Sequence, residues 1–340
     1  MMMALAAAMF CSCAKENNDV VEPQGQPPIE GQQVELSFVP DALGTRSFYE
    51  SFGHSEPWEK EIKTMYVYLY DSEGNFRMRR EVTAAEISAK RAVFGIPNFL
   101  AGTQCTFYVT VNLDHGIYYT TAELDKDVNT FYSNYNSDFL TVTQGCANAR
   151  GFIMTGKAEV VIAAAGQKTN IDMTLKRQLA KIAVRTHVDN AFTTAYNGAT
   201  IDITNVSLQN VALQTFHYYR EGAYPLYQTK TNIFQAPVWD GTYWQNLFYA
   251  NETAASSGNN HVMLVLTGTF DADGDPSTTD DQQVITYKVP FEASGDGLIN
   301  RNAYYRLFIR IKGLSGEDVA MNISVAEWEV VSQEVIDIGI

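Results

Sequence analysis

Short segments with the patterns of β-strands follow one another along most of the chain. In residues 34–38 the apolar side chains of Val, Leu and Phe alternate with Glu and Ser. Residues 65–70 and 106–111 are short apolar runs, and a turn-forming Asp-Ser-Glu-Gly sequence closes the first of them. Such alternation is typical of a strand with one buried face. A short continuous apolar run is typical of a strand that is buried on both faces. Residues 83–91 and 118–136 are compatible with short helices, so the pattern predicts an all-β fold with short helical insertions.

The strand patterns fall into two series, which predict two β-sandwich domains in tandem. The second series begins near Ile182, and each series spans about 150 residues, which suits one sandwich. We therefore expect an N-terminal sandwich over residues 34–178 and a C-terminal sandwich over residues 179–340. The junction, residues 174–181, lacks the Pro and Gly residues of a flexible linker, which predicts that the two domains are held rigidly.

Composition and charge narrow the classes of function. The chain has 340 residues, of which 46% are hydrophobic and only 19% are charged, so it contains enough apolar side chains for the cores of two domains. Its 39 Asp and Glu residues outnumber its 24 Lys and Arg residues, which gives a formal net charge of −15. Nucleic acids repel such a chain, and it has no polybasic patch for anionic lipids, so we expect no nucleic-acid partner.

The N-terminal residues have the features of an export signal. Residues 1–10 are wholly apolar, too short a run for a transmembrane helix, and lead into Cys11-Ser12-Cys13 and a polar stretch. A small residue before a cysteine resembles the lipobox of bacterial lipoproteins, so Cys13 is the expected site of lipidation by acyl chains such as palmitate. Residues 1–13 then form a signal peptide truncated at its basic start, and the Pro-containing residues 14–33 form a flexible tether.

Motifs of catalysis are absent from the sequence. The five histidines are scattered without the paired spacing of a metal site, and no nucleophile elbow, phosphate-binding loop or dinucleotide fingerprint occurs. Beyond the N-terminal segment, Cys105 and Cys146 are too few for a metal cluster, and they could form one disulfide bridge or remain thiols. We therefore expect neither an enzyme nor a bound cofactor.

One acidic loop is a candidate for a metal site. Asp271, Asp273 and Asp275 alternate in a loop that Asp280 and Asp281 follow. Alternate carboxylates can chelate Ca²⁺, but the glycine and glutamate positions of an EF-hand loop are not matched. We favour a solvated hairpin loop, with weak Ca²⁺ binding as the alternative.

Aromatic residues in the second half of the chain make a glycan-binding surface an alternative function. Sugars stack on aromatic faces, but the same side chains also pack between the sheets of a sandwich, and we favour that packing. The residues are Trp239, Tyr243 and Trp244, with Tyr218, Tyr219, Tyr224 and Tyr227 upstream.

Amphipathic strands lie near both ends of the sequence. Ile336, Ile338 and Ile340 alternate with Asp and Gly, in the same period-two pattern as residues 34–38. An apolar strand at a free end promotes aggregation unless another strand covers it. A turn-rich stretch follows the N-terminal strand, and its Arg46 is open to a trypsin-like protease. Two ordinary sheet strands and an ordinary loop arginine explain the same residues.

Several short segments spread over the chain carry a family resemblance. They are Ile62–Asp71 with Gly74, Phe107–Asn112, Ile153–Gly156, Leu175–Ile182, Phe248–Glu252, Arg301–Tyr305 and Val325–Trp328. Their order, together with the lipobox and Arg46, resembles that of the fimbrillin family, the subunits of the type V pili of Bacteroidales. The resemblance extends over nearly the whole chain.

The resemblance implies two Greek-key, transthyretin-like sandwiches and a processing step. Subunits of such pili reach the cell surface as lipoproteins, and an arginine-specific surface protease removes the N-terminal strand with its lipid. In this chain, cleavage between Arg46 and Ser47 would remove residues 14–46, including a pro-strand within residues 34–46. The buried row of the removed strand would be Val34, Leu36 and Phe38.

The resemblance also implies how copies would join. Residues 330–340 of the next copy, with Ile336, Ile338 and Ile340 as their buried row, would fill the vacated groove by β-augmentation. Head-to-tail growth of this kind does not close, so it gives a filament.

The sequence thus predicts a structural subunit of a cell-surface fimbria that supports adhesion. Its partners would be other copies of itself, related fimbrial subunits and the surface protease, and a lipid would anchor it to the outer membrane before maturation. If Arg46 is not cleaved, the N-terminal strand stays in place and the protein is an anchor, tip or accessory subunit. A glycan-binding surface lipoprotein is the alternative from another class.

Overall fold

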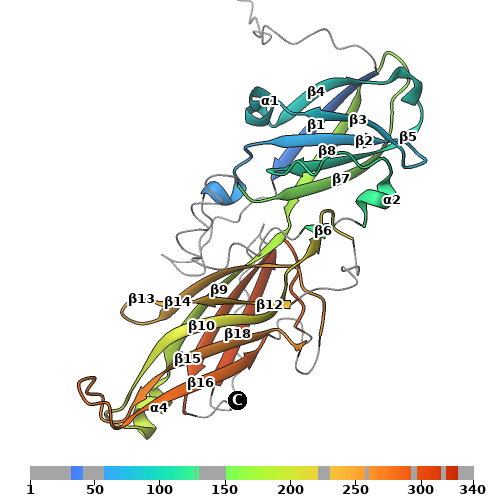
Figure 1. Ribbon diagram of the computed structural model, residues 1–340. Helices are drawn as coiled ribbons and strands as arrows, with labels where there is room; N and C mark the ends of the chain where they lie inside the picture. Colours follow the sequence, from blue (N-terminus) through green and yellow to red (C-terminus); the bar gives the residue numbers. More distant parts are fainter. Residues whose placement is uncertain are drawn as a thin grey trace, which may run out of the picture.

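Strands dominate the described part of the chain. The computed structural model describes residues 32–40, 57–126, 128–129, 151–220, 230–256, 260–291, 297–314 and 319–327. Its strands form two β-sandwiches that lie end to end (Figure 1). The helices among these residues are short, so the predicted all-β fold with short helical insertions is confirmed. They are α1 (Ala84–Ala89), α2 (Thr121–Leu124) and α4 (Asn190–Ala195), with the 3-10 turns η1 (Pro57–Lys60) and η2 (Asn98–Leu100).

The first sandwich has two layers that join along one short ladder. One layer has the strand order β3-β2-β5-β7 and the other the order β8-β1-β4, while β7 and β8 pair only at Met154–Arg177 and Thr155–Lys176. Alternate side chains of both layers point into one core, as the period of two predicts. The strands are β1 (Gln32–Pro40), β2 (Met65–Tyr70), β3 (Phe76–Glu81), β4 (Arg91–Ile96), β5 (Gln104–Val111), β7 (Met154–Val161) and β8 (Thr169–Arg177).

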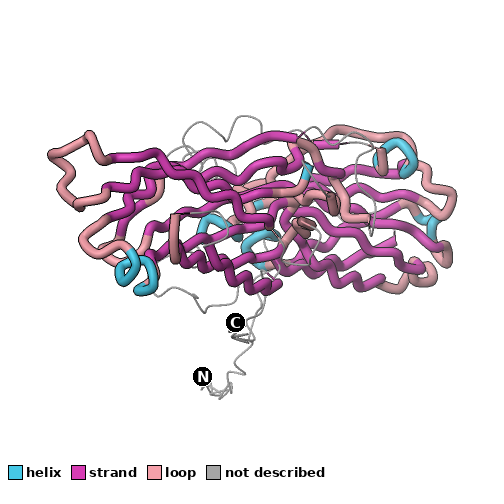
Figure 2. The backbone as a smooth tube through the Cα atoms, turned by 90° about the horizontal axis from the view of Figure 1, so that it is seen from below, coloured by secondary structure: helices cyan, strands magenta, loops and turns pink. Residues whose placement is uncertain are grey.

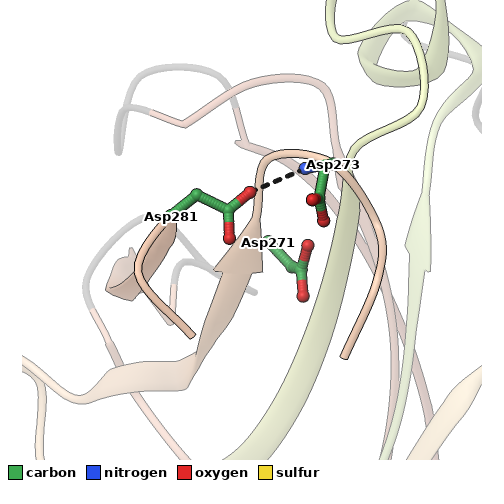
Figure 3. A group of neighbouring side chains, drawn as sticks. All are labelled: Asp271, Asp273 and Asp281. Atoms are coloured by element: carbon green, nitrogen blue, oxygen red, sulfur yellow. Dashed lines mark hydrogen bonds between the residues drawn. The ribbon is translucent and has the colours of Figure 1, made fainter. Parts of the chain in front are cut away.

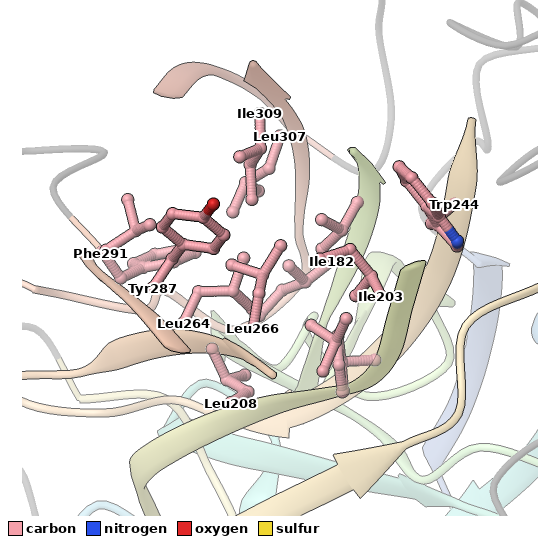
Figure 4. Packing of buried hydrophobic residues seen from close by; sticks show 14 of the residues in the cluster. Ile182, Ile203, Leu208, Trp244, Leu264, Leu266, Tyr287, Phe291, Leu307 and Ile309 are labelled. Carbon is pink, nitrogen blue, oxygen red and sulfur yellow. The ribbon is translucent and has the colours of Figure 1, made fainter. Parts of the chain in front are cut away.

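The second sandwich packs a four-stranded sheet on a five-stranded one. Leu208, Leu266 and Tyr287 of the first sheet meet Ile182 and Leu307 of the second in one apolar core (Figure 4). The four-stranded sheet, in order, is β12 (Lys230–Gln235), β10 (Thr200–Ala212), β15 (Met263–Asp271) and β16 (Gln282–Pro290). The five-stranded sheet is β13 (Val238–Trp239), β14 (Trp244–Asn251), β9 (Leu179–Val188), β17 (Ala303–Ile311) and β18 (Val319–Glu327).

Strands lead directly from one sandwich into the other. β8 of the first sandwich ends at Arg177, and β9 of the second begins at Leu179. Beside this connection, β6 (Val128–Asn129) pairs antiparallel with β11 (Thr215–Phe216), so each half of the chain contributes one strand to a small shared sheet. Strands make up most of the described backbone, and the helices are short segments between them (Figure 2).

A buried ion pair joins the two sandwiches. The Glu59 carboxylate in η1 accepts from the Lys181 ammonium of β9 at 2.6 Å, and both side chains are at most 1% exposed. The Tyr249 hydroxyl of β14 donates to the same carboxylate oxygen. Arg177, itself buried, donates from Nε to the Glu59 carbonyl at 2.8 Å. Because these groups are shielded from water, their mutual ion pair and hydrogen bonds offset part of the cost of burying them.

Aromatic rings form a second contact between the sandwiches. Tyr218 of the second half packs edge-on against Tyr108 of β5, with 4.6 Å between ring centroids. The His115 ring stacks on Tyr68 at 4.3 Å, and its Nε2 lies 3.0 Å from the Tyr218 hydroxyl oxygen. The ring centroids of His217 and His115 are 5.4 Å apart, so two histidines that are distant in the sequence meet at the junction. Burial raises the pKa of Tyr218 well above its usual value, so the phenol stays neutral here.

Glu59→Ala should destabilise the protein by about 3–5 kcal/mol, because it leaves the Lys181 ammonium buried without its carboxylate. Denaturant unfolding of the whole chain measures this change. Lys157→Ala is the matched control, since the pair of Lys157 with Glu159 is exposed and should contribute less than about 1 kcal/mol. Equal effects of the two substitutions would contradict a structural role for the buried pair.

Candidate functional site

β1 is the central strand of its three-stranded layer. Its residues 34–40 pair in parallel with residues 169–175 of β8, and its residues 32–37 pair antiparallel with residues 91–96 of β4. Both edges of β1 are therefore occupied. If β1 left, β8 and β4 would each expose an unpaired edge, which is a template for another strand. We call the channel between β8 and β4 that β1 fills the β1 groove.

The inner face of β1 is an apolar row. Val34, Leu36 and Phe38 are 0%, 0% and 1% exposed and belong to the core of the first sandwich. Burying each such side chain is worth about 1.5–3 kcal/mol relative to leaving it in water. The alternating pattern correctly predicts this buried row, whereas displacement of the strand stays a prediction.

The outer face of β1 is held by charge. Glu35 accepts two hydrogen bonds from Arg91 of β4, each of 2.6 Å, and one from the ammonium of Lys168, the residue before β8. The Arg91 hydrogen bond, followed by that of Lys168, lowers the pKa of Glu35 to about 2. At the start of the strand, the Gln32 amide donates to the carbonyls of Ala164, at 3.0 Å, and Gln167. A single carboxylate thus ties β1 to both of its neighbours.

Several predicted site residues lie outside the described residues. These are the lipidation site Cys13, the cleavage site Arg46 and Ser47, and the donor row Ile336, Ile338 and Ile340. The chain between β1 and η1 that contains Arg46 comprises residues 41–56.

The acidic loop brings together a different set of carboxylates from the one its spacing suggests. Carboxylate oxygens of Asp271, Asp273 and Asp281 lie within 4.8 Å of one another (Figure 3). Asp275 instead accepts from the backbone nitrogen and hydroxyl of Ser277, which lowers its pKa. The other carboxylates also accept hydrogen bonds within the loop, for example Asp281 from the Asp273 nitrogen at 2.9 Å. The arrangement is that of a hydrogen-bonded hairpin loop.

The aromatic residues considered for glycan binding are divided among different surroundings. Trp244 is buried at the edge of the second core and Tyr218 at the junction between the sandwiches, whereas Trp239 and Tyr219 are 52% and 55% exposed. The Tyr243 ring lies under the Arg185 guanidinium at 4.7 Å. Tyr224 and Tyr227 lie outside the described residues. Trp239 packs against Trp244 with 4.6 Å between ring centroids, whereas Tyr218 belongs to a separate aromatic cluster.

Sequence reasoning missed the polar partners of β1. Arg91 and Lys168 come from segments far from Glu35 in the sequence, and nothing in the pattern of β1 identifies them. The available signal was an acidic residue in the middle of an apolar strand, which calls for a cation on a neighbouring strand.

A family match covers most of the sequence. Residues 28–334 match the family described as "Fimbrillin-A associated anchor proteins Mfa1 and Mfa2". No curated protein matches the chain. None of the helices in the described part is long and apolar enough to span a membrane.

Solved structures of similar fold come from Bacteroidales. One is a candidate cell adhesion protein from Parabacteroides distasonis, with 15% identity, a TM-score of 0.62, and 90% of this chain and 100% of that one covered. A fimbrilin, FimA, from Porphyromonas gingivalis has 15% identity and a TM-score of 0.57, with coverages of 89% and 99%. The C-terminally truncated tip fimbrial protein Mfa3 from the same organism has 12% identity and a TM-score of 0.55, with coverages of 87% and 100%. At this identity the likeness concerns the fold.

Acid should weaken the ion pairs that join β1 to its neighbouring strands. Because the pKa of Glu35 is lowered to about 2, its ion pairs stabilise the fold above the usual carboxyl pKa near 4.5 and are lost as the pH falls towards 2. The difference in unfolding free energy between the wild type and Glu35→Gln should therefore shrink over this range. Ser37→Ala, an uncharged change on the same face of β1, should give a constant difference. If the difference between the wild type and Glu35→Gln does not vary with pH, the ion pairs of Glu35 do not stabilise the fold in this way.

Proposed function

Because the chain belongs to the family of fimbrillin-A associated anchor proteins Mfa1 and Mfa2, we propose that it is a non-catalytic subunit of a cell-surface fimbria that assembles by strand exchange. Its N-terminal strand β1 would be removed after cleavage at Arg46, and the C-terminal strand of another copy or of a related subunit would replace it. The fimbria would support adhesion.

The position of β1 between β8 and β4 is the observation that supports this proposal. β1 fills a channel between two strands, buries one apolar row and makes both of its hydrogen-bond ladders with strands that follow it in the sequence. Removing it would leave a groove with two unpaired edges and an apolar floor. Such a groove is suited to β-augmentation, in which main-chain hydrogen bonds give affinity and alternate side chains give specificity.

The candidate donor has the composition that the groove requires. Ile336, Ile338 and Ile340 would bury about 1.5–3 kcal/mol each, in addition to the backbone ladder. Because each copy would carry both a groove and a donor strand, each added copy would present a new donor, and growth would continue as a filament.

Export and processing complete the proposal. A lipid on Cys13 and the tether of residues 14–33 would hold the precursor at the outer membrane until the surface protease acts. The working protein would then begin at Ser47 and comprise the rest of an N-terminal domain ending at residue 178 and a C-terminal domain over residues 179–340.

A second candidate is a fimbrial anchor that keeps β1. The ion pairs that join Glu35 to both neighbouring strands favour retention of β1, and the matched family is described by its anchor proteins. Such a subunit would donate its own C-terminal strand but accept none, so it would end a fibre. A glycan-binding lipoprotein finds less support, because Trp244 and Tyr218 are buried.

Arg46→Ala should abolish the ladder of surface polymers, because the covalently attached β1 would keep the groove filled. Polymer length on denaturing gels of unheated cell-surface material is the measurement. Arg220→Ala, at an exposed arginine in the second half of the chain, should leave the ladder unchanged. Undiminished polymer from Arg46→Ala would exclude cleavage at this site, and a wild-type chain that is never cleaved would identify the anchor.

Deleting residues 335–340 should stop the growth of polymers made of this chain alone, since each copy would keep its groove but lose its donor. The truncated chain should still be processed at Arg46 and should cap wild-type polymers when mixed with them. Shafts of normal length from the truncated chain would refute the donor assignment.

A further inference from the structure

Residues 34–38 and 336–340 carry the same order of side-chain types. The first segment reads Val-Glu-Leu-Ser-Phe and the second Ile-Asp-Ile-Gly-Ile, so each alternates three apolar residues with one acidic and one small residue. We propose that residues 336–340 of a second copy enter the β1 groove in the direction of β1, with Asp337 in the place of Glu35. This inference rests on the strand exchange proposed above and adds to it a register, a direction and the residues that select them.

Two cations define the position of the acidic residue. Arg91 reaches Glu35 from β4, and Lys168 reaches it from the opposite neighbour, β8. If β1 left with its carboxylate, both cations would flank the same place in the groove. Their side chains are partly exposed, at 53% and 39%, so an ion pair there adds modest affinity but strongly favours one register and speeds encounter.

Charge is needed because apolar alternation leaves the register open. A slip of two residues returns every isoleucine to the inner face, so the apolar row tolerates it. A slip that places Asp337 at the position of Ser37 sets it between Arg91, the partner of Ser37 on β4, and Asp172, the partner of Ser37 on β8. The carboxylate then keeps one cation but moves away from Lys168 and meets an anion. The same slip brings Glu334 to the fully buried position of Val34, where an unpaired carboxylate is costly.

Two other ways of placing residues 336–340 in the β1 groove also fit it less well. A slip in the other direction leaves the buried site of Phe38 empty, and the core loses packing there. Entry in the opposite direction keeps three isoleucines inside but again places Asp337 between Arg91 and Asp172, away from Lys168. Both arrangements set Gly339, which carries no charge, between the two cations.

The proposed register has a second consequence at the entrance of the groove. It aligns Glu334 with Gln32, which is only 2% exposed and whose side-chain nitrogen donates to the carbonyl oxygens of Ala164 and Gln167. The Glu334 carboxylate is therefore also buried in this register, at the end of the strand instead of in the apolar row. A carboxylate can only accept hydrogen bonds and cannot replace that amide. Glu334→Gln should therefore raise the rate of polymer growth severalfold in this register, by restoring the donor.

A charge-reversal cycle tests the register in the full chain. The donor is reversed by Asp337→Lys, and the acceptor by Glu35→Lys with Arg91→Glu and Lys168→Glu, which keeps opposite charges paired in the precursor. After treatment with an arginine-specific protease, each reversal alone should slow polymer growth about tenfold, because like charges then meet in the groove. The two reversals together should restore the wild-type rate. Lys157→Glu, on the outer face of β7, is the control substitution and should have no effect.

The outcomes separate this inference from the proposed function. If the wild-type chain forms no polymer after cleavage, strand exchange is refuted and the register with it. If it polymerises but Asp337→Lys has no effect, or the combined reversal does not restore growth, strand exchange stands and the register is wrong. A loss of growth from Glu334→Gln would equally overturn the alignment with Gln32.

Discussion

Two hydrogen-bond ladders, one on each side, hold β1 between β8 and β4. Without β1, these neighbours would not be joined, because β4 is hydrogen-bonded within its layer only to β1. The layer also contributes the inner row that closes the core of the first sandwich. The first sandwich therefore needs a strand at this place, but the ladders and the apolar row do not require that the strand belong to the same chain. A fold with this property can be completed from outside.

The junction between the sandwiches sets how far a loss of β1 would spread. η1 follows β1 in the sequence, and its Glu59 is fixed to Lys181 and Tyr249 of the second sandwich. β8, which forms one wall of the β1 groove, leads within two residues into β9. The wall of the groove is thus an extension of a strand that is anchored in the second sandwich. Removal of β1 would leave this wall in place, so a replacement strand would meet one preformed edge with which to pair.

The fold follows from the sequence where the information is local. Alternation at residues 34–38 and the apolar run at 65–70 predict β1 and β2, since a strand repeats every two residues whatever its neighbours are. The partners of Glu35 and Glu59 depend instead on the order of strands in the sheets, which no single segment contains. The acidic loop shows the same limit: Asp281 lies closer to Asp271 than the spacing suggests, because two strands of a hairpin converge there.

Covalent attachment decides whether an outside strand can compete with β1. While residues 41–56 join β1 to the rest of the chain, the strand is present at an effective concentration of roughly millimolar, so a donor at ordinary dilution cannot displace it. Once the connection is cut, β1 becomes a separate ligand. If its concentration is low, a β1 strand that has dissociated does not bind again. An equally tight strand carried by a neighbouring copy then replaces it. The same groove can therefore be inert in a precursor and open to assembly in a cleaved chain, with no change in the fold around it.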